Sequence, residues 1–398
     1  PPRRPALPEP RLPRRSRHRA PARSVNESPG KTTGWVQNGT GPIEIGMYFT
    51  DQGTLVVSRN RFSNLAGQDG APAASVSAGG GAGTSPMGSF IVHAANATLT
   101  GNTITLLRGG RGGTGAAGGA LSGTAGGAGG SAQGIVVVNT PVVTIQGNVI
   151  GNLTGGRGGD GGTSTGADGG RGGEGGSAAA IQVLNTTGSA SWASNQVWHL
   201  TAGAGGFGGG TTLATRQDGA GGKGGDAFGI FFSGCLNAQL AGDLVQDLRG
   251  GRGGNSTAAG TGNGAGGPAG QALGLAVYGA DGMTTVSDLS VAFLTGGHGG
   301  NARIGGSGGN STAVFVSGFG SRFNATSLSG LAIQNITGGA GGNGLASGGE
   351  GGPATGILEF HVNASLLSDS VQNLRGGDGG AAVGTNPAGS GGTAAGIA

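Results

Sequence analysis

Glycine is the residue that most restricts how this chain can fold. It fills 100 of 398 positions, and much of it stands in Gly-Gly-X triplets such as those of residues 109–113. Each glycine loses more backbone freedom on folding than any other residue, so this much glycine usually indicates disorder. Here, however, the glycine-rich stretches alternate evenly with short apolar runs. That alternation is typical of a repeat architecture.

Each repeat unit begins with a small residue followed, in all but one copy, by an apolar one. Successive starts lie about 39 to 49 residues apart, which predicts about eight repeats. The starts are Gly46-Met47, Gly88-Ser89 (a weaker copy), Gly134-Ile135, Ala180-Ile181, Gly229-Ile230, Gly274-Leu275, Ala313-Val314, Gly356-Ile357 and Gly396-Ile397.

A second apolar run follows within each unit. It reads Asn or Asp, any residue, a β-branched or aromatic residue, two residues and then Leu, as in Asn148 to Leu153; Leu289 and Leu331 replace the Asn or Asp in two units. The two runs and the turn between them supply about twenty residues, enough for one coil of a parallel β-helix. The pattern therefore predicts an all-β solenoid in which stacked Asn and Asp side chains satisfy backbone groups at one turn.

The glycine-rich half of each unit has a period of three. A polyproline II strand also has three residues per turn, so Gly-Gly-X places glycine on two faces and X on the third. Strands leaving successive coils would lie about 4.8 Å apart, where facing positions must lack side chains. We therefore expect polyglycine II-like arms that run out and back over about 30 Å each way and pack as a second layer.

Opposite charges alternate at several X positions: Arg157 with Asp160, Arg171 with Glu174, Lys223 with Asp226 and Arg375 with Asp378. Three residues of polyproline II span about 9 Å. On that distance we expect the charges to pair across adjacent arms and not along one arm.

Composition divides the chain into two parts. Residues 1–30 form a Pro/Arg-rich stretch expected to be disordered, and residues 31–398 form the repeat domain. Because eight arginines stand in residues 1–24, the rest holds 14 basic and 17 acidic side chains, a net charge of −3 that argues against nucleic-acid binding.

The single Cys235 excludes an intrachain disulfide. No apolar run could span a membrane, and the unfinished last unit predicts C-terminal truncation.

The coil residues, for instance Gly229-Ile230-Phe231-Phe232 through Asp243-Leu244-Val245, resemble the right-handed parallel β-helix repeats of pectate-lyase-like proteins. The arms look like the glycine-rich repeats of mycobacterial PE-PGRS surface proteins, although this chain has no PE-type helical domain. They are also similar to the polyglycine II bundles of snow-flea antifreeze protein and of some phage tail-fibre adhesins. These resemblances imply a solenoid with a glycine layer over residues 40–398.

Polysaccharide lyases and hydrolases with this fold need clustered carboxylates. The acids in or near the coils stand mostly one per unit without a close pair, and the histidines lack metal-ligand spacing. We therefore expect no catalytic, metal or cofactor site. The acids are Glu44, Asp51, Asp243, Asp247, Asp281, Asp288, Glu359 and Asp369, and the histidines are His18, His93, His199, His298 and His361.

Three further motifs have ordinary interpretations. Residues 221–229 fit the nonapeptide of calcium-binding β-rolls, but one copy cannot supply about six oxygen ligands. Arg108–Arg111 and Arg249–Arg252 resemble RGG boxes of RNA-binding proteins, yet the mixed charge elsewhere weakens phosphate attraction. Ten Asn-X-Ser/Thr sequences permit glycosylation without requiring it, at Asn26, Asn38, Asn96, Asn152, Asn185, Asn255, Asn310, Asn324, Asn335 and Asn363.

The expected function is that of a non-catalytic, extracellular or cell-surface structural or adhesion protein, because solenoids present long repetitive surfaces. Surface glycans or other cell-surface proteins are the expected partners, and self-association is left open. The alternatives are an ice- or polysaccharide-binding module on the flat glycine face and, further, a β-helix polysaccharide lyase or hydrolase.

Overall fold

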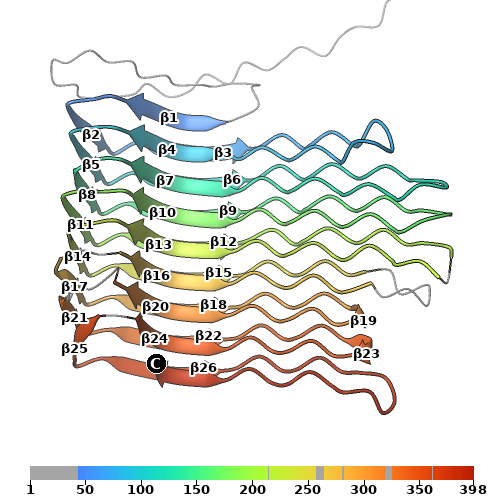
Figure 1. The fold of residues 1–398 in the computed structure, drawn as a ribbon. Coiled ribbons are helices and arrows are strands. Elements are labelled where there is room, and N and C mark those ends of the chain that lie inside the picture. Colours follow the sequence, from blue (N-terminus) through green and yellow to red (C-terminus); the bar gives the residue numbers. More distant parts are fainter. Residues whose placement is uncertain (1–43, 214, 257–263, 280–281, 319–324, 361) are drawn as a thin grey trace, which may run out of the picture.

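The computed structural model describes residues 44–213, 215–256, 264–279, 282–318, 325–360 and 362–398. The stretch 1–30 lies outside the described residues. Every paired strand in the described part is parallel to its partner, and the chain stacks coil upon coil (Figure 1). This confirms the predicted all-β parallel β-helix of about eight coils.

Three parallel sheets form the walls of the solenoid. Sheet 1 contains β1 (Ile45–Thr50), β4 (Met87–Val92), β7 (Ala132–Val138), β10 (Ala178–Leu184), β13 (Ala227–Ser233), β16 (Ala272–Tyr278), β20 (Ser311–Ser317), β24 (Ala354–Phe360) and β27 (Ala394–Ile397). Sheet 2 contains β2 (Thr54–Ser58), β5 (Asn96–Thr100), β8 (Val142–Gln146), β11 (Ser189–Ala193), β14 (Asn237–Ala241), β17 (Thr284–Ser287), β21 (Ala325–Ser329) and β25 (Asn363–Leu367). Sheet 3 contains β3 (Arg61–Ala66), β6 (Thr103–Arg108), β9 (Val149–Thr154), β12 (Gln196–Thr201), β15 (Leu244–Arg249), β18 (Ser290–Thr295), β22 (Ala332–Thr337) and β26 (Ser370–Arg375).

The core is a column of apolar side chains at matching repeat positions. Ile135, Ile181, Ile230 and Leu275 are consecutive partners across sheet 1, and each is at most 1% exposed. The predicted unit starts are therefore in register. The sequence pattern distinguished two apolar runs per unit, whereas each coil has three strands, because the sheet 2 strands are short and alternate buried with exposed positions, as in Thr54–Ser58.

A ladder of amide side chains runs through the turn before sheet 3, as predicted. The Oδ1 of each member accepts the backbone N–H of the member one coil earlier, at 3.0 Å from Asn60 to Asn102 and 2.9 Å from Asn102 to Asn148. The ladder continues through Asn195 to Asp243, at 3.0 and 2.7 Å. Leu289 and Leu331 are instead buried and apolar. The ladder satisfies backbone groups that the bend would otherwise leave unpaired inside the protein.

The arms form a second layer beside the solenoid (Figure 1). We call the residues after each sheet 3 strand the outbound leg and those before each sheet 1 strand the return leg. The first glycine of a pair donates its N–H to the same leg of the next arm, as from Gly109 to the Thr154 carbonyl at 2.8 Å. The second glycine donates to the opposite leg, as from Gly156 to the Gly130 carbonyl at 2.8 Å. Each leg is thus hydrogen-bonded both to the same leg of the next arm and to an opposite leg.

The packing leaves no room for a side chain at these glycines. A Cβ atom on Gly156 would lie 1.9 Å from the Gly110 carbonyl oxygen, and one on Gly155 would lie 2.0 Å from the Gly176 carbonyl oxygen. Two of the three directions around each leg are therefore filled by neighbouring legs, and the X side chain points away from both. This confirms the predicted polyglycine II-like second layer. Two short strands, β19 (Ala302–Ile304) and β23 (Gly344–Ser347), pair in two of the later arms.

Candidate functional site

The outer face of the outbound legs carries a groove lined by arginines, which we call the arginine groove. It has a volume of about 430 Å³. Its side-chain lining comprises Arg108, Arg111, Thr154, Arg157, Thr201, Ala202, Ala204, Arg249 and Arg252, with glycine backbone between them. The two RGG-like segments, far apart in sequence, therefore meet at one surface.

Repeat register explains where the arginines stand. Arg108, Thr154, Thr201 and Arg249 are consecutive partners across sheet 3, so two threonines separate two arginines. A second row follows three residues later, where backbone hydrogen bonds align Arg111 with Arg157, Ala204 and Arg252. The small residues Thr201 and Ala204 form a floor between arginine-bearing legs. The outermost legs are three strand spacings, or about 14 Å, apart.

Two of the five arginines already have partners. The Arg157 guanidinium lies 2.5 Å from an Asp160 carboxylate oxygen and 4.5 Å from the centre of the Phe207 ring. The Arg249 Nε lies 3.2 Å from an Asp247 carboxylate oxygen. Within the described part of the chain, Arg108, Arg111 and Arg252 form no ion pair with a carboxylate. The Asp69 carboxylate accepts the Arg111 backbone N–H at 2.7 Å. Five arginines therefore stand beside three carboxylates, and the groove keeps an excess of positive charge.

The expectation that opposite charges pair across adjacent arms is wrong. Arg157 with Asp160, Arg171 with Glu174, Lys223 with Asp226 and Arg375 with Asp378 all pair along one leg, at 2.5, 3.9, 3.0 and 3.0 Å. The physical reason is the length of the Arg and Lys side chains, which lean along the leg and cover the separation of about 9 Å between successive X positions. Adjacent legs are therefore joined by backbone hydrogen bonds instead.

A polar groove of about 520 Å³ adjoins the arginine groove at Arg249 and lies on sheet 3. Each sheet 3 strand has a residue with positive φ directly before the core Leu or Ile, and His199 (φ 52°), Asp247 (φ 54°) and Phe293 (φ 57°) line this groove. The left-handed backbone turns these side chains outward. The His199 Nε2 lies 3.0 Å from an Asp247 carboxylate oxygen.

Sequence reasoning treated His199 and Asp247 as isolated residues and missed this pair. The available signal was their shared place in the repeat, because each directly precedes the Leu that ends the second apolar run. A similar contact joins His93 to Asp51 at 3.5 Å.

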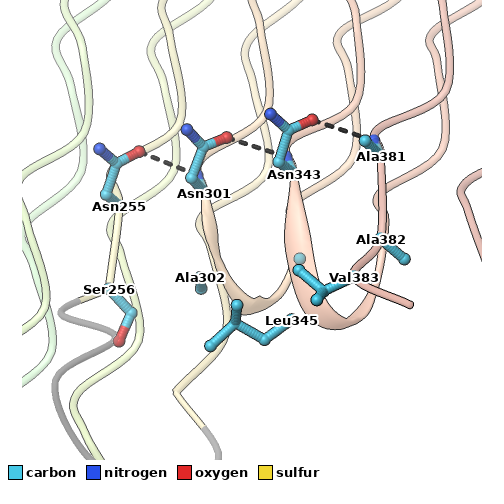
Figure 2. Close-up of a pocket in the computed structure, with 10 residues that line it drawn as sticks. Asn255, Ser256, Asn301, Ala302, Asn343, Leu345, Ala381, Ala382 and Val383 are labelled. Atoms are coloured by element: carbon cyan, nitrogen blue, oxygen red, sulfur yellow. Dashed lines mark hydrogen bonds between the residues drawn. The ribbon is translucent and has the colours of Figure 1, made fainter. Parts of the chain in front are cut away.

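A third groove, of about 360 Å³, lies near the arm tips, and Figure 2 shows its lining. Asn255, Asn301 and Asn343 form a row in which each Oδ1 accepts the backbone N–H of the next arm, at 2.8, 2.8 and 2.9 Å, the last from Ala381. The rest of the lining is mainly small or aliphatic. The row resembles the amide ladder of the solenoid, but its hydrogen bonds run in the opposite direction along the stack.

The remaining candidates are engaged in structural contacts or lie apart. Asp226, in the calcium-binding-like segment, contacts Lys223 and accepts the Gln271 backbone N–H at 2.8 Å. His18, Asp281 and His361 lie outside the described residues. Among the residues that are described, no three or more His, Cys, Asp or Glu side chains gather closely enough to hold a metal ion.

No family model, curated protein or solved structure matches this chain. Its fold and surface define a parallel β-helix repeat protein with a glycine second layer and an arginine-lined groove on that layer. Over the described ranges, no helix is long and apolar enough to cross a membrane.

Proposed function

We propose that this chain is a non-catalytic structural or adhesion repeat protein that acts outside the cell or on the cell surface. The observation that carries the proposal is the interlocked glycine layer, whose legs are hydrogen-bonded to one another through successive arms. Such a layer stiffens the solenoid and gives it broad flat faces. Each added repeat lengthens the body by one strand spacing, about 4.8 Å, without changing the packing.

The proposed kinship is with pectate-lyase-like β-helices for the coils and with PE-PGRS-like surface proteins for the arms. The repeat style supports it: apolar unit starts in register, as for Ile181 and Ile230, alternate with Gly-Gly-X legs. That combination supports a surface role, because a long repetitive body is suited to holding other groups away from a cell.

Binding to a polysaccharide is the second candidate, and the arginine groove favours it over ice. An ice-binding face would present regular ranks of similar small side chains, whereas the outbound legs mix Arg, Thr, Ala and Phe. A polysaccharide lyase or hydrolase is the third candidate, and the His199–Asp247 pair is the observation that bears on it. Release of reducing ends from a glycan incubated with the protein would support that candidate.

Surface location can be tested in the producing organism. An epitope followed by a protease site would be inserted beside Leu121, which lies at an arm tip and is 62% exposed. The proposal expects antibody binding to intact cells and loss of the epitope when protease is added outside. Cleavage after lysis provides the control, and a cytosolic marker must stay intact. An epitope that is cleaved only after lysis would contradict the proposal.

A further inference from the structure

We propose that the arginine groove binds a single chain of an acidic polysaccharide, one that bears carboxylate or sulfate groups. The chain would lie along the outbound leg of residues 202–210, between the arginine-bearing legs. The inference deepens the proposed function, because an extracellular location would bring the groove into contact with such glycans.

The charge of the groove requires an anionic ligand. Arg108, Arg111 and Arg252 are exposed, and their guanidinium groups form no ion pair with a carboxylate in the described part of the chain. The Asp160 and Asp247 carboxylates are already paired with Arg157 and Arg249. A third carboxylate, on Asp69, accepts the Arg111 backbone N–H at 2.7 Å, so the five arginines of the groove outnumber the carboxylates beside them. A guanidinium group donates two parallel hydrogen bonds to a carboxylate or sulfate, which fixes the orientation of the ligand.

The neutral part of the groove indicates a sugar chain. Thr154 and Thr201 contribute hydroxyl groups that can exchange hydrogen bonds with sugar hydroxyls. Phe207, 45% exposed, stands on the same leg beyond the groove lining, where the Arg157 guanidinium covers one face of its ring and the exposed remainder can contact an apolar sugar face. The groove thus has a few cations separated by hydroxyl groups and one ring. This spacing of charges matches a polymer with one charge on every sugar or every second sugar. A nucleic acid, charged at each phosphate, would favour a denser array of cations.

The groove is also rigid before any ligand arrives. Its floor is backbone held by hydrogen bonds on both sides, as where Gly203 donates to the Gly176 carbonyl at 2.7 Å and Gly205 donates to the Arg252 carbonyl at 2.8 Å. Binding therefore orders only the arginine side chains and the ligand. Such preorganisation lowers the entropic cost of association.

The test uses the purified 398-residue chain and measures binding calorimetrically at low salt. The probes are polygalacturonate, dextran sulfate, neutral dextran and single-stranded oligouridylate. The groove variant Arg111→Gln/Arg252→Gln is compared with Arg171→Gln/Arg375→Gln, which removes the same charge from a return leg and from a leg outside the groove. Circular dichroism melting checks that both variants fold.

We expect at least one acidic glycan to bind, neutral dextran not to bind, and the groove variant to lose about tenfold or more in affinity, as removal of a bidentate charged contact would give. The control variant should change by less than about twofold. Comparison of polygalacturonate with dextran sulfate shows whether the groove prefers carboxylate or sulfate groups.

Three outcomes would overturn the proposal: equal losses in the two variants, tighter binding of oligouridylate than of either glycan, or no binding of either acidic glycan. Because these measurements use purified protein, they are independent of where the protein resides in the organism. A failure here would leave the surface-location test untouched, and a failure of that test would leave the binding result standing.

Discussion

The turn before sheet 3 carries a buried Asn in several successive coils and then, at the equivalent position, Asp243. Asn102, Asn148 and Asn195 each accept a backbone N–H and donate their Nδ2 to the main-chain carbonyl of Val57, Leu99 or Ile145, at 2.9 to 3.0 Å. Asp243 keeps the acceptor role, but its Oδ2 is buried and has no hydrogen-bond partner among the described residues. Burial raises the pKa of Asp243 from 3.8 to about 6, opposed in part by the hydrogen bonds from Asn195.

This residue makes folding stability depend on pH. Because the pKa of Asp243 is higher in the folded state, its contribution is fully present below about pH 4 and is lost as pH rises through 6, by up to about 3 kcal/mol. Asp243→Asn should raise the free energy of unfolding at pH 7 by about 1–3 kcal/mol and remove most of this pH dependence. The new amide could donate to the Trp192 carbonyl.

Denaturant unfolding at pH 4, 6 and 7.5 would check this, with the exposed Asp378→Asn as the control variant. Equal pH profiles for the wild type and Asp243→Asn would show that the carboxylate finds another partner.

At the scale of elements, the glycine legs differ from ordinary strands because their sequence is dictated by two close neighbours at once. The Gly-Gly-X period was sufficient to predict this, since two glycine faces out of three leave few other ways to pack. The direction of the charge pairs was not predictable from residue spacing alone. It depends on side-chain rotamers, and Arg157 bends toward both Asp160 and Phe207.

Two glycines at equivalent places in successive return legs allow a matched test. A Cβ on Gly351 would lie 2.0 Å from the Gly377 carbonyl oxygen, whereas on Gly391, in the last leg of this chain, its nearest contact would be 3.7 Å. Gly351→Ala should lower the free energy of unfolding by about 1–3 kcal/mol, as overpacking does, and Gly391→Ala by much less. Comparison of thermal midpoints in the 398-residue chain would check this. Equal shifts would mean that the legs can separate at little cost.

At the scale of the whole molecule, solenoid and glycine layer share one continuous hydrogen-bonded network. We expect the amides of the inner legs, for example Gly156 and Gly176, to exchange with deuterium roughly a thousandfold or more slowly than in an unfolded chain. Their protection should approach that of the core strand β10. Hydrogen exchange followed by mass spectrometry would check this. Unprotected glycine amides beside a protected solenoid would instead describe independent arms.

Much of this architecture could be predicted from sequence because the repeat units can be aligned with one another within the single chain. Unit starts such as Ile135 and Ile181 align in the sheet as they do in the sequence. The middle strand of each coil was harder to recognise, since its four or five residues carry at most two buried side chains, as Leu55 and Val57 show in β2. The arginine groove was missed because it depends on small residues, Thr201 and Ala204, standing between legs that bear arginine.

The threefold period of the legs also limits how a gene for such a protein can change. Losing one codon within a leg would rotate everything beyond it by a third of a turn and drive an X side chain into the neighbouring backbone. Tolerated insertions and deletions should therefore come as whole triplets or fall at the tips. The arms already vary in length, from residues 202–226 in one coil to 296–310 in a later one. That difference is not a whole number of triplets, so part of it must fall at the tip. Natural relatives should differ in reach while keeping the phase of their glycines.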